Sequence, residues 1–295
     1  MILKGKTIVV TGSGRGIGKA AAIACAKEGA NVGLTSRTLE ELNNTKKEIE
    51  DLGLGVNVVV KTADITKYEE VEKIFKEFKD ELGLFNGVIA NAGYAWLGFV
   101  TELDPEKFEM NLKVNILGVF NTYKAAYPYL KKDDKNLKAK FFITGSAIYP
   151  NANPRMGAYA AGKYGVVGFM RTLAAEIKQK RENITVNMIL PMQVDTKMLR
   201  GRSAGDGNKP PNVLAPEDLN DYYVFMMSDE ANKIHDGLIY PSDLQKVEKI
   251  IDKAPPEKKE HLEVFLDYLK ENSPKTFDNV KKLKPIVEYL LTSPK

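Results

Sequence analysis

The chain has 295 residues, of which 43% are hydrophobic and 28% charged, and this composition is ordinary for a soluble globular protein. Its net charge is +4, with 32 basic and 29 acidic residues through Pro241 and 11 and 10 beyond it. Neither part is a basic arm, so nucleic acid is not an indicated partner. No apolar run reaches membrane-spanning length and residues 1–6 show no signal-peptide pattern. We therefore expect a cytoplasmic protein with no membrane partner.

The cysteine and histidine content argues against metal and histidine-based chemistry. The lone Cys25 lies in an apolar helical stretch, which favours a buried structural thiol in a reducing compartment. The two histidines, His235 and His261, have no acidic or serine partner at a suggestive spacing. A histidine triad or a histidine-rich metal site is thus not expected.

The first 200 residues alternate short apolar runs with longer helical patterns. Because the runs are apolar throughout, they indicate a parallel sheet with helices on both faces, a Rossmann-type doubly wound α/β fold with about seven strands. Ligands bind such sheets beyond the carboxyl ends of the strands. The predicted strands are Thr7–Thr11, Asn31–Thr35, Val56–Thr62, Gly87–Asn91, Lys140–Gly145, Ile184–Leu190 and Gly237–Tyr240, and the predicted helices include Gly18–Glu28, Leu39–Leu52, Tyr68–Glu81, Pro105–Leu130 and Ala158–Lys180.

Two later segments differ from this pattern. The segment Arg200–Pro211 is rich in glycine, proline and charge, and it is either a plain surface loop or a cover for a substrate. From Ser242 onward only helical patterns occur, so we divide the chain into a catalytic domain, 1–241, and a helical C-terminal extension, 242–295. An apolar stripe in this tail favours packing on its own or a neighbouring subunit over an external partner. The stripe consists of Leu262, Phe265, Leu266 and Leu269.

A glycine-rich turn follows the first strand. Gly12, Gly16 and Gly18 leave the backbone unobstructed where it turns into a helix, and the helix N-terminus presents N–H groups to a pyrophosphate. This favours nucleotide binding over a plain strand-to-helix turn. The binding residues would be Gly12, Ser13, Gly14, Arg15, Gly16, Ile17 and Gly18.

The end of the second strand indicates which dinucleotide is bound. It reads Leu34-Thr-Ser36-Arg37, with no Asp or Glu between Asn31 and Leu39 to hold a ribose 2′-hydroxyl. Arg37, beside Ser36, suits a 2′-phosphate, and Arg15 could approach the same group. The alternative is that both arginines are ordinary solvated side chains. The sequence predicts NADP(H) in preference to NAD(H).

Tyr159 and Lys163 lie four residues apart in a predicted helix, so their side chains share one face. An ammonium group favours the phenolate and lowers a phenol pKa that is ordinarily near ~10, which suits a general acid and base for a carbonyl oxygen. Tyr127 and Lys131 show the same spacing. What distinguishes Tyr159 is the strand-end Ser146, thirteen residues upstream.

Taken together, the motifs resemble those of the short-chain dehydrogenase/reductase family over about residues 4–240. They occur in the family's order: TGSGRGIG at 11–18, Asp64, Asn91-Ala92-Gly93, Asn115, Ser146 and Tyr159-x-x-x-Lys163. The resemblance implies an NADP(H)-dependent oxidoreductase that interconverts a ketone or aldehyde and an alcohol by hydride transfer.

It also implies roles for four catalytic residues. Tyr159 would donate a proton to the carbonyl oxygen, and Ser146 would hydrogen-bond the same oxygen. Lys163 would bind the nicotinamide ribose and lower the pKa of Tyr159. Asn115 would hold a water that links Lys163 to solvent; the plain alternative is an asparagine that tolerates a helix kink.

The remaining implied contacts are with the cofactor. Asp64 would accept a hydrogen bond from the adenine, with Ile65 beside the ring. The segment Asn91, Ala92 and Gly93 would lie against the adenosine side. The residues implied to bind near the nicotinamide are Pro191, Val194 and Thr196, with Tyr159 and Lys163.

Two departures from the family pattern bear on the pocket. Met192 stands where the family usually has glycine and adds bulk near the nicotinamide, and the glycine-rich end after the seventh strand is missing. Candidate pocket residues are Tyr94, Trp96, Tyr149, Asn153 and Met156, although each could be ordinary packing.

Two functions remain open at this point. The first is the NADP(H)-dependent reductase of a small carbonyl compound, expected as a homodimer or homotetramer through the helices Pro105–Leu130 and Ala158–Lys180. The second is a non-catalytic NADP-binding sensor or scaffold that works through its C-terminal tail.

Overall fold

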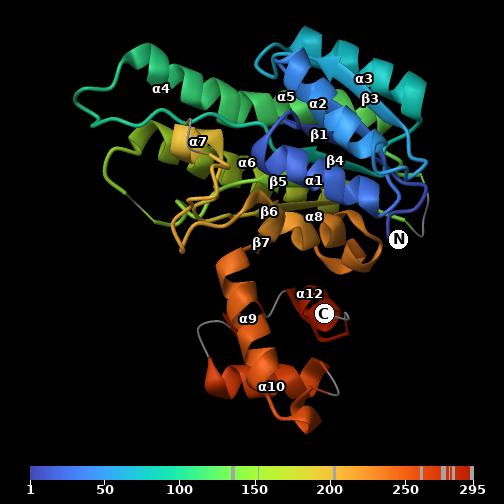
Figure 1. Cartoon of the computed structure of the whole chain (residues 1–295), viewed down its shortest axis with the longest axis vertical. Helices are drawn as coiled ribbons and strands as arrows, with labels where there is room; N and C mark the ends of the chain where they lie inside the picture. The colour runs from blue at the N-terminus through green and yellow to red at the C-terminus, as the bar shows by residue number, and fades with distance from the viewer. Residues whose placement is uncertain are drawn as a thin grey trace.

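The computed structural model describes residues 1–133, 137–151, 153–201, 204–259, 262–273, 277–278, 280 and 283–292. Of the residues discussed above, Arg202, Ser203 and His261 lie outside this part. The core is a seven-stranded parallel sheet in the order β3-β2-β1-β4-β5-β6-β7 (Figure 1). The strands are β1 (Thr7–Thr11), β2 (Asn31–Ser36), β3 (Val58–Thr62), β4 (Gly87–Ala90), β5 (Ala139–Thr144), β6 (Ile184–Ile189) and β7 (Gly237–Ile239). The predicted doubly wound fold is confirmed.

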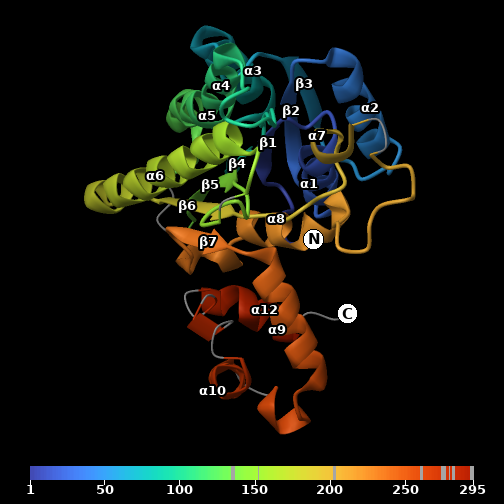
Figure 2. The ribbon, with the colours of Figure 1, turned by 90° about the vertical axis from the view of Figure 1, so that its left-hand side faces the viewer.

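Helices cover both faces of the sheet (Figure 2). The central strands β1, β4, β5 and β6 are buried along their whole length, which explains why their sequences are apolar throughout instead of alternating. One apolar cluster lies under α1 (Gly16–Lys27), α2 (Leu39–Glu50) and α8 (Asn220–Met227). The other lies under α3 (Tyr68–Leu82), α5 (Gly118–Ala126) and α6 (Gly157–Lys180).

The strand order reverses between β1 and β4, which lie side by side although the chain visits β2 and β3 between them. At such a reversal the loops after the two strands diverge and leave a crevice at the carboxyl edge of the sheet. The turns after β1, β4, β5 and β6 all lie at this edge. They carry the motifs that the sequence analysis identifies.

The predicted helix Pro105–Leu130 is interrupted. It consists of α4 (Pro105–Leu112), a π-helical turn η1 (Lys113–Leu117), α5 and a 3₁₀ turn η2 (Tyr127–Tyr129). A π-helical turn widens the helix by one residue and is frequent at functional sites. Helix α8 is not among the predicted helices, because its apolar residues surround it and leave no 3.6-residue period.

The C-terminal tail contains α9 (Pro241–Lys253), η6 (Pro256–Lys258), α10 (Leu262–Asn272) and α12 (Lys284–Thr292), and it lies beneath the β7 end of the sheet (Figure 1). Three residues of the predicted stripe, Phe265, Leu266 and Leu269, are buried in the same apolar cluster as α8. The rings of Phe225 in α8 and Tyr289 in α12 are 5.0 Å apart. The tail therefore buries its apolar stripe within its own chain.

Candidate active site

Glycines allow the turn after β1 and the turn after β4 to meet backbone to backbone. Gly12 and Gly16 have φ of +68° and +56°, in the left-handed region that favours glycine. A Cβ atom added to Gly12 would lie 2.9 Å from the Ala92 Cα, and one added to Gly18 would collide with the Gly12 carbonyl oxygen. Side chains at these positions would force the two turns apart.

Asn91 and Thr11 fasten these two turns together. The Thr11 hydroxyl accepts hydrogen bonds from the Asn91 and Ala92 N–H groups at 3.0 and 3.1 Å. In return, the Asn91 amide donates to the carbonyl oxygens of Thr11 and Gly12 at 3.2 and 3.4 Å. The predicted Asn91-Ala92-Gly93 segment thus lies directly beside the glycine turn.

The geometry of this turn fits a dinucleotide pyrophosphate. Helix α1 begins at Gly16, and its N-cap residue, Arg15, makes no side-chain capping hydrogen bond. The N–H groups of the first turn, including those of Ile17 and Gly18, are therefore not capped by Arg15, as an incoming phosphate requires. Ser13 is fully buried, and its hydroxyl donates to the Thr35 carbonyl oxygen at 3.4 Å.

At the end of β2, the two arginines differ in what they contact. The Arg15 guanidinium forms an ion pair of 2.8 Å with the carboxylate of Glu41 in α2, a residue absent from the predicted site. Arg37 is exposed, and Ser36 approaches the glycine turn: a Cβ added to Gly14 would lie 3.2 Å from the Ser36 hydroxyl oxygen. Ser36 and Arg15 thus lie at the glycine turn with an acidic neighbour, and the role of Arg37 stays a prediction.

Asp64 and Ile65 follow β3 at the same edge of the sheet. Burial raises the pKa of Asp64, but hydrogen bonds from the Thr66 N–H and hydroxyl, with the charges of Arg37 and Lys67, outweigh it and lower the pKa overall. The carboxylate is therefore an ionised hydrogen-bond acceptor. The Ile65 side chain is buried against α5, since a Cβ added to Gly118 would lie 2.5 Å from its Cδ1.

Helix α6 places Tyr159 and Lys163 on one buried face at the carboxyl end of β5. The Lys163 Nζ lies 5.7 Å from the centre of the Tyr159 ring and donates a hydrogen bond of 2.9 Å to the Thr144 carbonyl oxygen. The Tyr159 hydroxyl is hydrogen-bonded to Ser146, two residues beyond Thr144. The structure therefore brings together Ser146, Tyr159 and Lys163, as the sequence predicts.

The pKa expected for Tyr159 is not found. Burial raises the pKa of Tyr159 above its ordinary value. The hydrogen bond with Ser146 lowers the pKa, but by less than burial raises it. Burial also lowers the pKa of Lys163, to about 8. The prediction that Lys163 lowers the phenol pKa is wrong for this structure, because burial disfavours both charged forms and the ammonium is directed at a carbonyl oxygen.

Asn115 lies in the π-helical turn, one side of which faces Gly93 and Lys163. Its amide donates to the carbonyl oxygens of Tyr94 and Asn111 at 2.7 and 2.9 Å, and its oxygen accepts from the Tyr94 N–H at 3.2 Å. A Cβ added to Gly93 would lie 3.3 Å from the Asn115 oxygen and 3.7 Å from the Lys163 Nζ. Asn115 thus ties the loop after β4 to the widened helix and lies near Lys163, and its water-holding role stays a prediction.

The segment after β6 lies over the glycine turn. The Pro191 carbonyl oxygen accepts a hydrogen bond from the Ala147 N–H at 2.8 Å, and Val194 is buried. The Thr196 methyl would be 3.1 Å from a Cβ on Gly16. Met192 is 55% exposed, so its bulk is directed largely to solvent instead of into the sheet.

A methionine of the short helix α7 (Lys197–Arg200) also reaches the site. The Met198 methyl would lie 3.7 Å from a Cβ on Gly93. Of the predicted pocket residues, Tyr149 packs its ring against Tyr164 with centres 4.9 Å apart, and Trp96 is 46% exposed with Lys107 over its ring. Tyr94 is placed at the site by its backbone contacts with Asn115.

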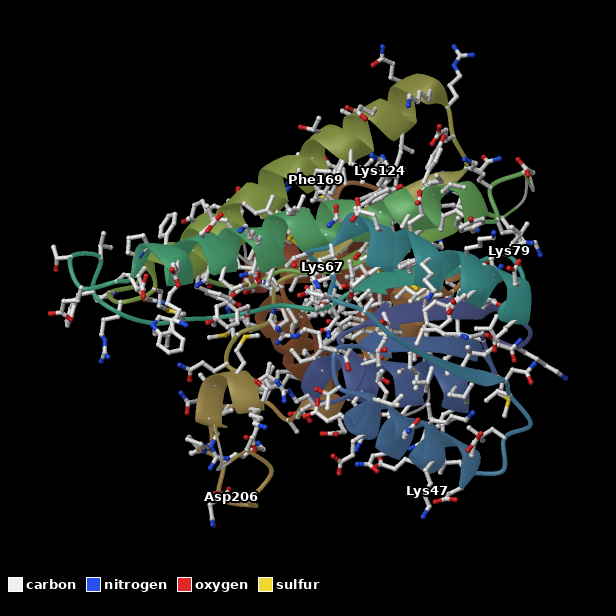
Figure 3. The ribbon with its side chains drawn as sticks, turned by 90° about the horizontal axis from the view of Figure 1, so that it is seen from above. Lys47, Lys67, Lys79, Lys124, Phe169 and Asp206 are labelled. Atoms are coloured by element: carbon white, nitrogen blue, oxygen red, sulfur yellow. The ribbon has the colours of Figure 1, made fainter. Side chains whose placement is uncertain are left out.

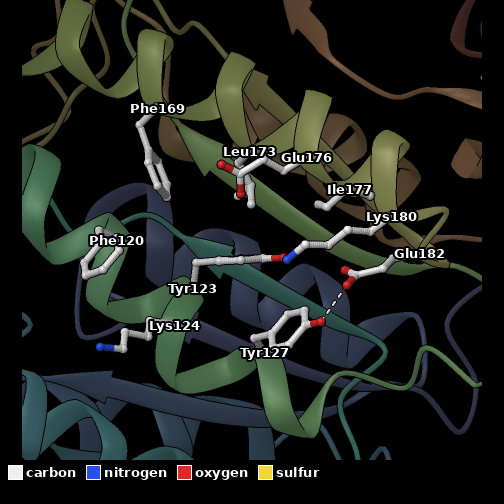
Figure 4. A pocket seen from close by; sticks show the side chains of 10 residues that line it. All are labelled: Phe120, Tyr123, Lys124, Tyr127, Phe169, Leu173, Glu176, Ile177, Lys180 and Glu182. Carbon is white, nitrogen blue, oxygen red and sulfur yellow. Dashed lines mark hydrogen bonds between the residues drawn. The ribbon is translucent and has the colours of Figure 1, made fainter.

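The second tyrosine–lysine pair lies in a different part of the molecule. Tyr127 lines a groove of about 250 Å³ between α5 and α6 and donates a hydrogen bond of 2.6 Å to Glu182 (Figure 4). This bond and burial raise the pKa of Tyr127 to about 12. Lys124 and Phe169, which line the same groove, lie between these two helices (Figure 3). Spacing alone therefore does not identify the candidate pair.

Four residues at the site were not found from the sequence: Thr11, Glu41, Thr144 and Met198. Thr144 acts through its backbone oxygen, so its residue type carries no signal, whereas Thr11 acts through its hydroxyl on a turn that is distant in sequence. Glu41 is in the first turn of α2, where an acidic residue is expected for the helix dipole alone.

Metal-binding and membrane-spanning features are absent from the part of the chain that the structure describes. It contains no cluster of three His, Cys, Asp or Glu side chains arranged to hold a metal ion. None of its helices is both long and apolar enough to cross a lipid bilayer.

Comparison with known proteins identifies the family. The family model for short chain dehydrogenase matches residues 6–207, and the chain therefore belongs to the short-chain dehydrogenase/reductase family of oxidoreductases. The family resemblance read from the motifs is confirmed.

Similar proteins include D-beta-hydroxybutyrate dehydrogenase of Cupriavidus necator, 28% identical over 260 residues that cover 82% of this chain and 98% of that protein. The (-)-trans-carveol dehydrogenase of Rhodococcus erythropolis is 31% identical over 67% of this chain and 74% of its own. Among solved structures, a short chain dehydrogenase from Burkholderia cenocepacia in complex with NADP is 26% identical with a TM-score of 0.72. It covers 81% of this chain and 97% of its own.

Proposed function

We propose that this protein is an NADP(H)-dependent oxidoreductase that interconverts a ketone or aldehyde and an alcohol. The observation that supports this most directly is the buried Tyr159 hydroxyl, hydrogen-bonded to Ser146 at the carboxyl end of β5 and one helical turn from Lys163. When bound, the dinucleotide supplies the hydride that reduces the carbonyl carbon.

In the direction of reduction, Tyr159 is the general acid. Burial keeps its pKa high, so the phenol stays protonated at neutral pH and has a proton to donate to the carbonyl oxygen. Ser146 holds that oxygen by a second hydrogen bond. In the direction of oxidation the phenol must first lose its proton, so we expect oxidation to accelerate as the pH rises and reduction to be favoured at neutral pH.

Lys163 positions the cofactor and supplies positive charge. Its Nζ uses one donor on the Thr144 carbonyl oxygen, which leaves two for a ribose hydroxyl and a water. With a pKa of about 8 it is charged at neutral pH and loses its charge in mild alkali. Asn115 orients the loop that carries Gly93, next to Lys163, and is proposed to help hold the water that returns protons.

Several features support NADP(H) as the cofactor. No acidic residue ends β2, Ser36 lies beside the glycine turn that carries Arg15, and Arg37 is exposed at the same strand end. Asp64 offers an ionised acceptor for the adenine, and Thr196 lies over Gly16. The Burkholderia cenocepacia protein was solved with NADP, and an alcohol dehydrogenase from Thermococcus sibiricus, 27% identical with a TM-score of 0.71, with 5-hydroxy-NADP.

The test replaces Tyr159 by phenylalanine and uses Tyr127→Phe as the matched control. Reduction of a panel of carbonyl compounds is followed by NADPH absorbance, and NADPH binding is followed by fluorescence. We expect Tyr159→Phe to lose about 10²-fold or more in turnover while it still binds NADPH, and Tyr127→Phe to match the wild type. Equal turnover by wild type and Tyr159→Phe would overturn the role given to this residue.

For the assembly, we propose a homo-oligomer through the outer faces of α5 and α6. The groove between these helices is lined by Phe120 and Phe169, whose rings meet edge to face at 6.1 Å, and Leu117 and Phe120 are each 40% exposed (Figure 4). Exposed apolar side chains on two long neighbouring helices favour burial against a second copy. Replacing Phe120 and Phe169 by serine is expected to lower the mass measured by sedimentation.

The sensor or scaffold alternative has less support. It assumes that the tail is free to bind a partner, but Phe265, Leu266 and Leu269 are buried within this chain. We keep residues 242–295 as a proposed extension of the catalytic domain 1–241, with which they share an apolar core.

A further inference from the structure

We infer that Glu41 limits how strongly the cofactor site discriminates NADP(H) from NAD(H). This inference rests on the proposed dinucleotide function, and it concerns the only chemical difference between the two cofactors, the 2′-phosphate on the adenosine ribose.

Glu41 reaches the same point as the residues that would hold this phosphate. A Cβ added to Gly14 would lie 2.9 Å from the Glu41 Cβ, 3.2 Å from the Ser36 hydroxyl oxygen and 3.4 Å from a Glu41 carboxylate oxygen. The first turn of α2, the end of β2 and the glycine turn therefore converge on Gly14. In this fold the adenosine ribose of the cofactor lies at the end of β2. Its 2′ position is where NADP(H) and NAD(H) differ.

Glu41 also forms an ion pair with Arg15, which lies in the glycine turn and could otherwise bind this phosphate. Its carboxylate and the Arg15 guanidinium are 2.8 Å apart, with the Glu41 side chain 30% exposed and the Arg15 side chain 54% exposed. An arginine binds a carboxylate and a phosphate with the same fork of donors, so the two groups compete for it. A 2′-phosphate must displace Glu41 from Arg15 or share the guanidinium with it.

The backbone holds Glu41 in this place. The Thr45 hydroxyl, fully buried one turn further along α2, is within 3.1 Å of the carbonyl oxygens of both Ser13 and Glu41. The first turn of α2 is thereby tied to the glycine turn. The position of the Glu41 backbone beside the glycine turn is therefore fixed.

The two cofactors would meet this carboxylate differently. A 2′-phosphate carries up to two negative charges and is repelled by Glu41, whereas a 2′-hydroxyl can donate a hydrogen bond to it. Arg37 provides positive charge at the same strand end and favours the phosphate. The balance of Arg37 against Glu41 yields a site that accepts NADP(H) but does not exclude NAD(H).

The experiment measures dissociation constants for NADPH and NADH with the full-length wild type, Glu41→Gln and Glu48→Gln, by cofactor fluorescence and calorimetry. Glutamine keeps the size of the side chain and removes only its charge. Glu48 is the matched control, because it forms an equivalent ion pair of 2.5 Å from α2 to Lys19 in α1 and lies about two helical turns beyond Glu41.

We expect Glu41→Gln to bind NADPH about threefold to tenfold more tightly, with NADH binding unchanged or weaker. NADPH binding by this variant should also weaken more steeply with added salt, since the site gains net positive charge. A ratio of NADPH to NADH affinity that stays within twofold of wild type, or that shifts equally in Glu48→Gln, would overturn the inference. If the wild type binds neither dinucleotide, the proposed function itself is wrong.

Discussion

Lys140 allows a sharp test of how burial changes the charge of a side chain in this fold. It lies near the amino end of β5, at the opposite edge of the sheet from Tyr159, and is 2% exposed. Its Nζ donates a hydrogen bond of 2.6 Å to the Asn232 side-chain oxygen. The charged groups that act on it are Asp229, which is paired with Lys6 at 2.8 Å, together with Lys138 and Lys6 itself.

Burial lowers the pKa of Lys140 to about 7, and Asp229 opposes this only in part. In the unfolded chain a lysine has a pKa of about 10.4. Between these values the unfolded state binds one more proton than the folded state, so stability rises with pH by up to about 1.4 kcal/mol per unit. The free-energy cost of burying Lys140 is largest below pH 7. It disappears as the pH approaches the pKa of lysine in the unfolded chain. From pH 7.5 to 9.0 the gain is about 2 kcal/mol.

The measurement is the free energy of unfolding in urea at both pH values for the wild type, Lys140→Met and Lys138→Met. Methionine keeps the length of the side chain without its charge, and Lys138, an exposed neighbour, is the control. We expect the stability of the wild type relative to Lys140→Met to increase by about 2 kcal/mol between the two pH values, and no such change relative to Lys138→Met. A difference constant to within about 0.5 kcal/mol would refute the claim that burial lowers the pKa of Lys140 in the folded protein.

Three further predictions follow from packing. Gly18→Ala should abolish NADPH binding measured by fluorescence, because the new Cβ would collide with the Gly12 carbonyl oxygen; Gly168→Ala, with no atom within 4 Å of its Cβ, should instead raise stability by about 0.5–1 kcal/mol. Leu283→Ala should lower the free energy of unfolding by about 2–5 kcal/mol in a single urea transition, and an unchanged midpoint would show that the tail unfolds separately. Cys25 should not react with a thiol reagent in the native state, since burial and Glu28 raise its pKa to about 12; rapid labelling would contradict its burial.

The sequence was sufficient for the sheet because the buried strands are short apolar runs and most of them alternate with longer helical patterns. The boundary errors are small: β3 begins at Val58 instead of Val56, and α1 begins at Gly16 instead of Gly18. The π-helical turn could not be predicted, because Asn115 fixes it through carbonyl oxygens of Tyr94 and Asn111 that no local pattern reveals.

The candidate site was predictable where residue type carries the chemistry, and not where the environment does. Ser146, Tyr159 and Lys163 were found by type and spacing, and they do meet. The direction of the Tyr159 pKa was wrong, because spacing reveals the neighbouring ammonium but not the burial that outweighs it. Glu41 was missed for a similar reason: its approach to Arg15 depends on how α2 packs against the glycine turn.

The shared core of the tail and α8 also has a consequence for synthesis. The chain emerges from the ribosome N-terminus first, so β7 and α8 are complete before the 54 residues after Pro241 have been made. At about 5–20 residues per second, those residues take roughly 3–11 s. During that interval Phe225 lacks Tyr289, and Gly237 lacks Leu283, as a packing partner. We expect nascent chains to be most prone to aggregation in these seconds, and a chaperone that covers apolar surface to act on this protein before α12 has been made.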